Sequence, residues 1–348
     1  MSDVPSVIRA AIDDHGPITF AEFMELALYG SGGFYEQPPI GASGDFVTSP
    51  HVHPVFGELM ARALRELWTS LGSPEPFHVV EVGAGDGTLA RQILGSLHDV
   101  PSRYTAVEIS AGARTSLASI ERIEVASEAP PRADVVLAHE VLDNLPFRVV
   151  RGDREVRIAT DGDGLHEELV AIDDDLRAEM AAVAAADGDV VVPVGISAFV
   201  DRVATMIDPG FALLVDYGDL GTTGGAIHGY RRHRVVGDVI RDPGSADITS
   251  GVDLSLVAAR ARGAGLQAFG PISQRQALGA LGFESWLRDE LARQRAQLAD
   301  GRGIEAVRTW SDRSRATLLV DPAALGRMRW IVLASAELDE PSWIAEGT

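Results

Sequence analysis

The sequence predicts an α/β fold built on a seven-stranded, Rossmann-like sheet, and three observations support this. From Phe77 onward, apolar runs of strand length alternate with runs of helix length. Such alternation is typical of a sheet with helices on both faces. A glycine-rich turn at Gly83–Gly87 joins the first of these strands to a helix. Residues 148–205 depart from the rhythm, which then resumes, so we expect an inserted lobe there.

The predicted core strands are apolar on both faces, as buried parallel strands are. Between them, helices are expected at about 87–97, 113–120 and 253–263. The strands themselves cover residues 77–83, 103–110, 123–127, 133–140, 211–218, 266–272 and 327–335.

Residues 1–75 predict an N-terminal helical cap with a lid loop. Residues 18–29 place apolar side chains on one face, and Thr19 with Glu22 has the spacing of a capping box. A second helix is expected at about 54–71. Glycines at 41 and 44, between the two helices, suit a loop that closes over a site.

The remaining chain divides around the inserted lobe. A chain of 348 residues is longer than one hydrophobic core usually supports, so insertions into one large domain, or two domains, are expected. We assign 76–147 and 206–348 to the two halves of the core, with the inserted α+β lobe at 148–205 between them.

Within that lobe, 148–170 resembles two or three antiparallel strands with tight turns. The segments 178–188 and 197–207 are predicted to be helical. A helical insertion at 283–316 is rich in arginine, and we interpret it as a charged, solvated helix, with an interface as the alternative.

The composition excludes several kinds of chemistry. The chain has no cysteine and no lysine, which removes disulfides, thiolate catalysis, cysteine–metal sites and Schiff bases; no metal is expected. The net charge of −21 disfavours nucleic acid as a partner and suits a basic protein or peptide. No apolar run is long enough for membrane insertion, and the N-terminus resembles no targeting peptide, so we expect a cytoplasmic protein.

The glycine-rich turn reads E-x-G-x-G-x-G, from Glu81 through Gly83 and Gly85 to Gly87. A dinucleotide site needs a third glycine at position 88, which here is Thr88. S-adenosylmethionine (SAM) has no pyrophosphate to place on the helix N-terminus, so the altered spacing favours SAM. We expect Glu81 to contact the methionine ammonium.

Polar residues after the next two strands fit the same ligand. Glu108 ends the second strand, where an acid hydrogen-bonds ribose hydroxyls. Ser127 and Glu128 follow the third strand, where the adenine is expected. The alternative is a tight strand–helix turn and an exposed polar loop with no ligand.

A polar segment follows the fourth strand, at the edge where doubly wound sheets bind ligands. It holds His139, Glu140 and Asp143. The two carboxylates could grip a planar cation such as guanidinium and accept its proton. Alternatively they are acids stabilised by a helix N-terminus, and His139 is packed beneath the site.

Six segments of the chain carry a resemblance to a known family. They are GPITFAEFMELALYGSGGFY, GDFVTSPHVHPVFGEL, VVEVGAGDGTLA, HEVLDNLPF, LLVDYG and HGYRRHRVVGDVIRDPGSADITSGVDL. Together they resemble the MidA family of class I SAM-dependent methyltransferases, whose mitochondrial members assist assembly of respiratory complex I. They run in family order over nearly the whole chain, and the N-terminal and PGSADIT segments are far more specific than a glycine motif.

The resemblance implies a class I methyltransferase fold, SAM as cofactor and N-methylation of protein arginine, with a complex I subunit as the known substrate of the mitochondrial members. It places Glu140 and Asp143 at the acceptor. Further residues are assigned to the lid and the acceptor side: Thr48, Ser49, Pro50, His51, Asp216, Tyr217 and His228. The chain departs from the family pattern at four positions, which are His51, His139, His228 and Ala246.

We therefore predict a SAM-dependent methyltransferase that acts on protein arginine. One alternative is a small-molecule or peptide methyltransferase, which an apolar acceptor pocket with His139 as base would favour. Another is a SAM-binding assembly factor without turnover.

Overall fold

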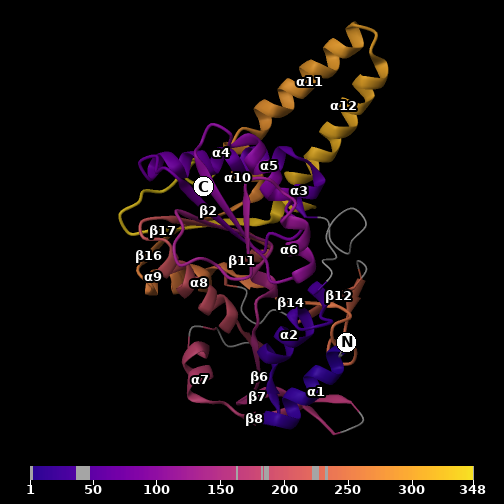
Figure 1. Ribbon diagram of the computed structural model, residues 1–348, viewed down its shortest axis with the longest axis vertical. Coiled ribbons are helices and arrows are strands. Elements are labelled where there is room, and N and C mark those ends of the chain that lie inside the picture. The colour runs from indigo at the N-terminus through magenta and orange to yellow at the C-terminus, as the bar shows by residue number, and fades with distance from the viewer. Residues whose placement is uncertain are drawn as a thin grey trace.

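The computed structural model describes residues 3–36, 48–161, 164–181, 183, 188–221, 227–231 and 234–347. The predicted closing loop around 41–44 lies outside these residues. At the centre of the molecule is a seven-stranded sheet, which forms the frame for all other elements (Figure 1).

All seven predicted core strands are present in this sheet. Their spatial order is β16-β17-β10-β5-β2-β3-β4, and only β17 runs antiparallel to its neighbours. The chain starts at the centre with β2, moves outward to β4, and returns to β5 on the other side of β2. This switch point opens a crevice at the carboxyl ends of β2 and β5, where such sheets bind ligands. The strands are β2 (Phe77–Val82), β3 (Ser102–Val107), β4 (Ile123–Ala126), β5 (Val135–His139), β10 (Phe211–Asp216), β16 (Leu266–Ser273) and β17 (Arg329–Ser335).

Helices cover both faces of the sheet, and successive side chains of each strand pack alternately into one helical layer and the other. Val79 packs into the layer of α4, α5, α10 and α13, whereas Val80 packs into that of α8 and α9. The helices are α3 (Ser49–Val52), α4 (Val55–Ser70), α5 (Thr88–Ser96), α6 (Ala111–Leu117), α8 (Val194–Met206), α9 (Leu254–Gly263), α10 (Gln274–Ala280) and α13 (Ser342–Ala345).

The inserted lobe shares one core with the N-terminal segment. In its five-stranded sheet, Thr19 of β1 lies opposite Arg157 of β7, so the first residues pair with the insertion. Helices α1 and α2 lie beside β6–β8 in Figure 1, and the predicted capping box of Thr19 and Glu22 starts α2. The elements are α1 (Val4–His15), β1 (Ile18–Thr19), α2 (Phe20–Tyr29), η1 (Phe34–Glu36), β6 (Arg148–Arg151), β7 (Arg154–Thr160), β8 (Leu165–Ala171), α7 (Asp174–Met180) and β9 (Asp189–Val192).

One predicted helix of the lobe is wrong in its bounds. The alanine-rich pattern predicts a helix over 178–188, but α7 begins at Asp174 and ends at Met180. The start is set by Asp173, whose side chain accepts a hydrogen bond from the backbone N–H of Leu176. The end of the predicted segment leads into β9, which pairs with β6; residues 182 and 184–187 are outside the described part.

A small three-stranded sheet stands over the crevice, in the order β13-β12-β14. The described chain also contains a separate two-stranded sheet and several short 3-10 helices. The elements are η2 (Leu142–Asn144), β11 (Gly218–Asp219), β12 (His228–Arg231), β13 (Arg234–Val236), β14 (Asp247–Thr249), β15 (Val252–Asp253), η3 (Thr317–Leu319) and η4 (Leu325–Arg327).

The arginine-rich insertion is an antiparallel pair of helices, α11 (Phe283–Ala299) and α12 (Gly303–Ala316). The helix breaks at Gly301, whose φ of 72° lies in the left-handed region. Figure 1 shows this hairpin projecting from the body at the end opposite the N-terminal helices. Among the described residues, no helix has both the length and the apolar character needed to cross a bilayer.

Replacing Gly57 by alanine tests how closely α4 and α5 pack. A Cβ at this buried position would lie 2.2 Å from Cβ of Gln92 on α5. We therefore expect the free energy of unfolding to fall by about 1–3 kcal/mol. Gly95→Ala on α5 is the matched control, because nothing lies within 4 Å of its added Cβ. The control should be stabilised by up to about 1 kcal/mol. Urea unfolding measures both, and equal midpoints would contradict the packing account.

Candidate active site

A cavity of about 1010 Å³ opens at the crevice of the central sheet. Its wall comes from the carboxyl ends of β2, β3, β5 and β10 and from α2, η2 and the β12–β14 sheet. Such a volume can hold a SAM-sized molecule with room for part of an acceptor.

Two of the three predicted glycines line this cavity. Gly83 and Gly85 have φ values of 72° and 55°, which a residue with a Cβ adopts only with strain. A Cβ on Gly83 would lie 2.6 Å from Cγ2 of Val141, so the bare backbone allows the β2 and β5 loops to approach.

Gly87 has a different role. It is the left-handed N-cap of α5 and does not line the cavity. A Cβ there would meet Ile120 at 2.4 Å and Leu117 at 2.7 Å. Gly87 therefore serves the turn and its packing rather than contact with a ligand.

Glu108, directly after β3, connects the glycine turn to the start of α6. Its carboxylate accepts the N–H of Gly85 at 2.9 Å and that of Ser110 at 2.8 Å. Burial raises the pKa of Glu108, and these backbone hydrogen bonds oppose the rise. Ile109 lines the cavity beside it with 56% of its surface exposed, and Ser127 lies on the same wall.

Two predicted cofactor residues do not line the cavity. Glu81 points to the other face of the sheet, where it accepts the Tyr104 hydroxyl at 2.8 Å. Burial raises the pKa of Glu81 to about 8. Glu128 is exposed beyond Ser127. Strand alternation directs Val82 rather than Glu81 to the cavity, so the Glu81 side chain is not placed for direct contact with an ammonium group there.

The loop after β5 presents the two predicted acceptor carboxylates. Glu140 has a φ of 55°, and its N–H donates to the carbonyl of Val215 at 2.8 Å. The buried Asp216 carboxylate accepts the N–H groups of Val141 at 3.0 Å and Leu142 at 2.7 Å. Asp216 does not line the cavity, so it is a positioning residue for this loop.

Glu140 and Asp143 both line the cavity and are uncompensated there. Oε1 of Glu140 and Oδ1 of Asp143 are buried without a hydrogen-bond partner among the described residues. Burial, with the charge of Asp216, raises the pKa of Glu140 to about 8. Burial and the carboxyls of Asp216, Asp247 and Glu140 raise the pKa of Asp143 well above its ordinary value. A buried pair of this kind favours a cation or a proton.

His139 lies beneath these carboxylates instead of in the cavity lining. Its ring packs against Phe56 with centroids 5.1 Å apart, and its Nε2 is 3.5 Å from Oε1 of Glu140. Burial lowers the pKa of His139 to about 3, so the ring is neutral near pH 7. Such a weak base is poorly suited to accept a proton from a substrate.

A tyrosine–amide–carboxylate cluster, absent from the predicted site, connects α2, η1 and β14 to η2 in the cavity wall. The Tyr35 hydroxyl donates to Oδ1 of Asp247 at 3.0 Å, and Asn144 Nδ2 donates to the same oxygen at 2.8 Å. The Tyr29 hydroxyl donates to the carbonyl of Asn144 at 3.1 Å. The two tyrosine rings stack with centroids 5.6 Å apart. Burial raises the pKa of Asp247 to about 6, although these hydrogen bonds lower it.

Some of the predicted lid residues line the cavity, and the others hold the lid segment to the core. Thr48 lines the cavity, and its Oγ1 is 2.8 Å from Nδ1 of His51. Nε2 of His51 lies 3.0 Å from Oδ2 of Asp86 in the glycine-rich turn. Burial opposes ionisation of Asp86, but hydrogen bonds from His51 and Thr88 outweigh it and lower its pKa to about 2. His51, a departure from the family pattern, thus holds the lid segment to the turn.

Ser49 and Pro50 support the lid from beneath and do not line the cavity. Ser49 is fully buried and hydrogen-bonded to Gln274 of α10. The carbonyl of Pro50 accepts Nε2 of Gln92 on α5 at 2.8 Å. Both residues therefore fix α3 to the core.

The remaining predicted residues lie at the outer part of the cavity. Tyr217, after β10, and His228, on β12, both line it. Burial raises the pKa of the Tyr217 hydroxyl, with the charge of Glu140 adding to the rise. The Arg327 guanidinium lies 5.7 Å from the Tyr217 ring centroid and is the only permanent cation among the described lining residues. The described residues contain no cluster of side chains suited to a metal ion.

Comparison with known proteins identifies the family. Residues 59–272 match a family model described as S-adenosyl-L-methionine-dependent methyltransferase. The mitochondrial protein arginine methyltransferase NDUFAF7 homolog of Drosophila melanogaster is 30% identical over 92% of this chain and 82% of its own length. Human NDUFAF7 is 29% identical over 80% of this chain and 73% of its own. The chain belongs to the MidA family.

A solved structure of a Burkholderia thailandensis protein bound to S-adenosyl-homocysteine supports the same conclusion. It superposes on this MidA-family chain with a TM-score of 0.82 and 25% identity, over 99% of this chain and 95% of the other. The predicted class I methyltransferase fold is confirmed, and the protein is a SAM-dependent methyltransferase.

The cavity of the MidA-family chain fits SAM on its own chemistry. Gly83 and Gly85 leave backbone open on one wall, and Glu108 stands where ribose hydroxyls are bound. The exposed Ile109 offers an apolar surface for a base. These residues would hold the cofactor, and Glu140 and Asp143 remain for the acceptor.

The tyrosine cluster is not predictable from local sequence. Asn144 stands within the acid-rich segment, but its partners Tyr35 and Asp247 are far from it in sequence. The one available signal was the family resemblance of the segments around these two residues. Arg327, in η4, had no such signal.

Two substitutions of Glu140 test the strained backbone. Both Glu140→Gly and Glu140→Ala remove the carboxylate, but only glycine accepts a φ of 55° without strain. The glycine variant should therefore be more stable than the alanine variant by about 1 kcal/mol. Urea unfolding of the two proteins measures the difference, and an alanine variant at least as stable would contradict the assigned conformation.

Proposed function

We propose that this methyltransferase transfers methyl groups to arginine side chains of a protein substrate. The observation that carries the proposal is the pair of buried, unpartnered carboxylate oxygens on Glu140 and Asp143 in the cavity wall. A guanidinium presents five N–H donors in a planar fork, which matches two carboxylates.

The charge of the cavity supports a cationic acceptor. Its lining includes Glu25, Glu108, Glu140, Asp143 and Asp247, against Arg327 as the only permanent cation among the described lining residues. A small neutral acceptor would need His139 as base, but His139 does not line the cavity and its lowered pKa makes it a weak base. The relatives from Drosophila melanogaster and human are named protein arginine methyltransferases, which agrees with a guanidinium acceptor.

The cavity residues have two roles in the reaction, which are to hold the acceptor and to remove its proton. When bound, SAM supplies an activated methyl group to a nitrogen lone pair and leaves as S-adenosyl-homocysteine. Glu140 and Asp143 hold the guanidinium, and one of them takes the proton that the nitrogen loses. Asp216 keeps their loop in place, so most of the rate comes from positioning. The family resemblance makes a subunit of respiratory complex I the first candidate substrate.

The proposal is tested by incubating the purified protein with methyl-labelled SAM and an extract of source cells that lack it. We expect label on a protein, recovered as methylarginine after hydrolysis. Label on a small molecule, or on another amino acid, would overturn the arginine assignment. Tight SAM binding with no labelled product would favour a role without turnover.

Asp143→Asn tests the acceptor side separately from the cofactor side. The amide keeps the shape of the side chain but carries no charge and accepts no proton. SAM affinity measured by calorimetry should change little, whereas turnover should fall about 10²-fold or more. Asp339→Asn is the matched control, on an exposed surface residue. Turnover that survives in Asp143→Asn with only a small loss would remove this residue from the mechanism.

The pH profile of kcat/KM for the acceptor tests the ionisation of Glu140. Its pKa is raised to about 8, so the carboxylate that accepts the proton becomes more populated as the pH rises. The rise of activity with pH should have its midpoint at or below about 8, because the sulfonium charge of bound SAM favours the ionised form of Glu140. Glu140→Gln should remove this rise. An identical rising limb in the variant would assign it to another group.

A further inference from the structure

Beyond Phe283 at its base, the buried side chains of the α11–α12 hairpin are small or polar. Its seam holds small and polar side chains, among them Ala306, Thr309 and Gln297. The Thr309 hydroxyl donates to Oε1 of Gln297 at 2.9 Å. Small and polar side chains at these positions gain little from the hydrophobic effect, and several large apolar side chains of the hairpin lie outside the seam.

Those side chains are exposed to solvent along the hairpin. On α12 they recur at i, i+3 and i+6, on the flank away from the buried Ala306 and Thr309. The exposed fractions are 57% for Leu298, 75% for Ile304, 63% for Val307, 53% for Trp310 and 44% for Leu318. Five of the nine large hydrophobic residues exposed among the described residues thus lie on this one projection or at its base.

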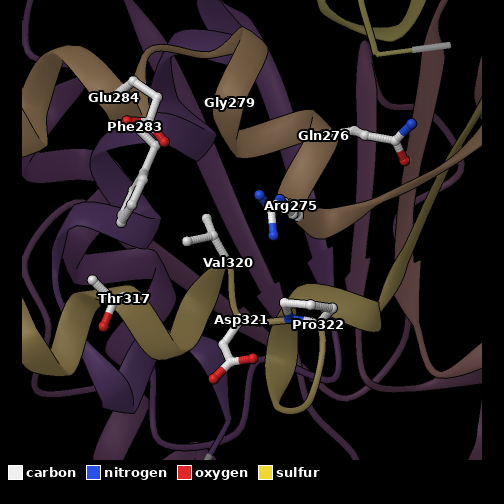
Figure 2. Close-up of a pocket in the computed structure, with 9 residues that line it drawn as sticks. All are labelled: Arg275, Gln276, Gly279, Phe283, Glu284, Thr317, Val320, Asp321 and Pro322. Atoms are coloured by element: carbon white, nitrogen blue, oxygen red, sulfur yellow. The ribbon is translucent and has the colours of Figure 1, made fainter.

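The exposed face continues to a second cavity at the base of the hairpin. Glu284 precedes Leu298 by two heptads on α11, so these two residues share a helix flank. Thr317 follows Trp310 by one heptad and lies directly after the end of α12. Glu284 and Thr317 line the base cavity of about 520 Å³. Figure 2 shows them with Phe283 and Val320 on its wall.

We propose that this face binds the same face of a second copy of the chain. The two hairpins would lie antiparallel, so that the tip around Leu298 and Ile304 of one copy reaches the base cavity of the other. The four helices would then bury the apolar side chains in a core of their own. This contact is isologous and closes as a dimer.

The size of the exposed face fits a dimer. At roughly 100 Å² exposed on each of five large side chains, the apolar part amounts to about 500 Å² per copy, against about 800 Å² per partner in a standard interface. The polar side chains around the apolar stripe supply the remaining area.

The distribution of charge favours the hairpin as the surface through which two copies of the chain bind. Residues 283–316 carry seven arginines and six acids, whereas the whole chain has a net charge of −21. Two bodies of such negative charge repel each other, but two nearly neutral hairpins do not. Because the hairpin projects away from the body, as Figure 1 shows, two hairpins can pair side by side while the two bodies stay apart.

The oligomeric state of the full-length protein tests the proposal, with sedimentation equilibrium over a range of concentrations. We expect a dimer for the unchanged chain and a monomer for Val307→Asp. Leu169→Asp is the matched control, since Leu169 is an exposed leucine on β8 of the lobe, and this variant should remain a dimer. Thermal unfolding and SAM binding confirm that each variant folds. A monomeric unchanged chain, or a folded Val307→Asp that stays dimeric, would overturn the proposal.

Introduced cysteines test the orientation, because the chain contains none of its own. A mixture of Leu298→Cys and Thr317→Cys proteins should form a mixed disulfide dimer on oxidation, since tip meets base. Leu298→Cys alone should form little covalent dimer. Efficient crosslinking of Leu298→Cys with itself would show a parallel arrangement and overturn the antiparallel one.

Discussion

The acceptor side of the active site depends on one buried carboxylate, that of Asp216 at the end of β10. It accepts backbone N–H groups of Val141 and Leu142, and of Tyr217 next to it in sequence. These hydrogen bonds hold the loop after β5 in a conformation that includes the left-handed Glu140. The switch point of the sheet sets β5 beside β10, so the topology supplies both the loop and its anchor.

The site concentrates negative charge that the protein leaves uncompensated. Glu140 and Asp143 have no hydrogen-bond partner for one oxygen each, and burial raises the pKa of both. Keeping such groups in a cavity opposes folding, because their ionisation is disfavoured there. A cationic acceptor would reverse this effect, because its charge stabilises the ionised carboxylates. The burial of Glu140 and Asp143 therefore makes the site both prefer a cation and accept a proton from it.

Much of the framework was predictable from the sequence because the relevant signals are local. The core strands are apolar on both faces, and Gly83, Gly85 and Glu108 follow strand ends that point to one crevice. The face of a doubly buried strand is not encoded in its periodicity, which is why Glu81 was expected at the cofactor and lies on the opposite side. Contacts between distant segments were also beyond reach, as with Tyr35 and Asp247. The arginine-rich insertion was interpreted as solvated, but its apolar flank becomes visible only when the seam of the hairpin is known.

The central claim is that Glu140 and Asp143 form the guanidinium site, and a crystal structure with S-adenosyl-homocysteine and an arginine-containing peptide tests it most directly. The account predicts the planar guanidinium against both carboxylates, with S-adenosyl-homocysteine over Gly83, Gly85 and Glu108. A guanidinium bound elsewhere in the cavity, or cofactor atoms in direct contact with Glu140 and Asp143, would contradict it.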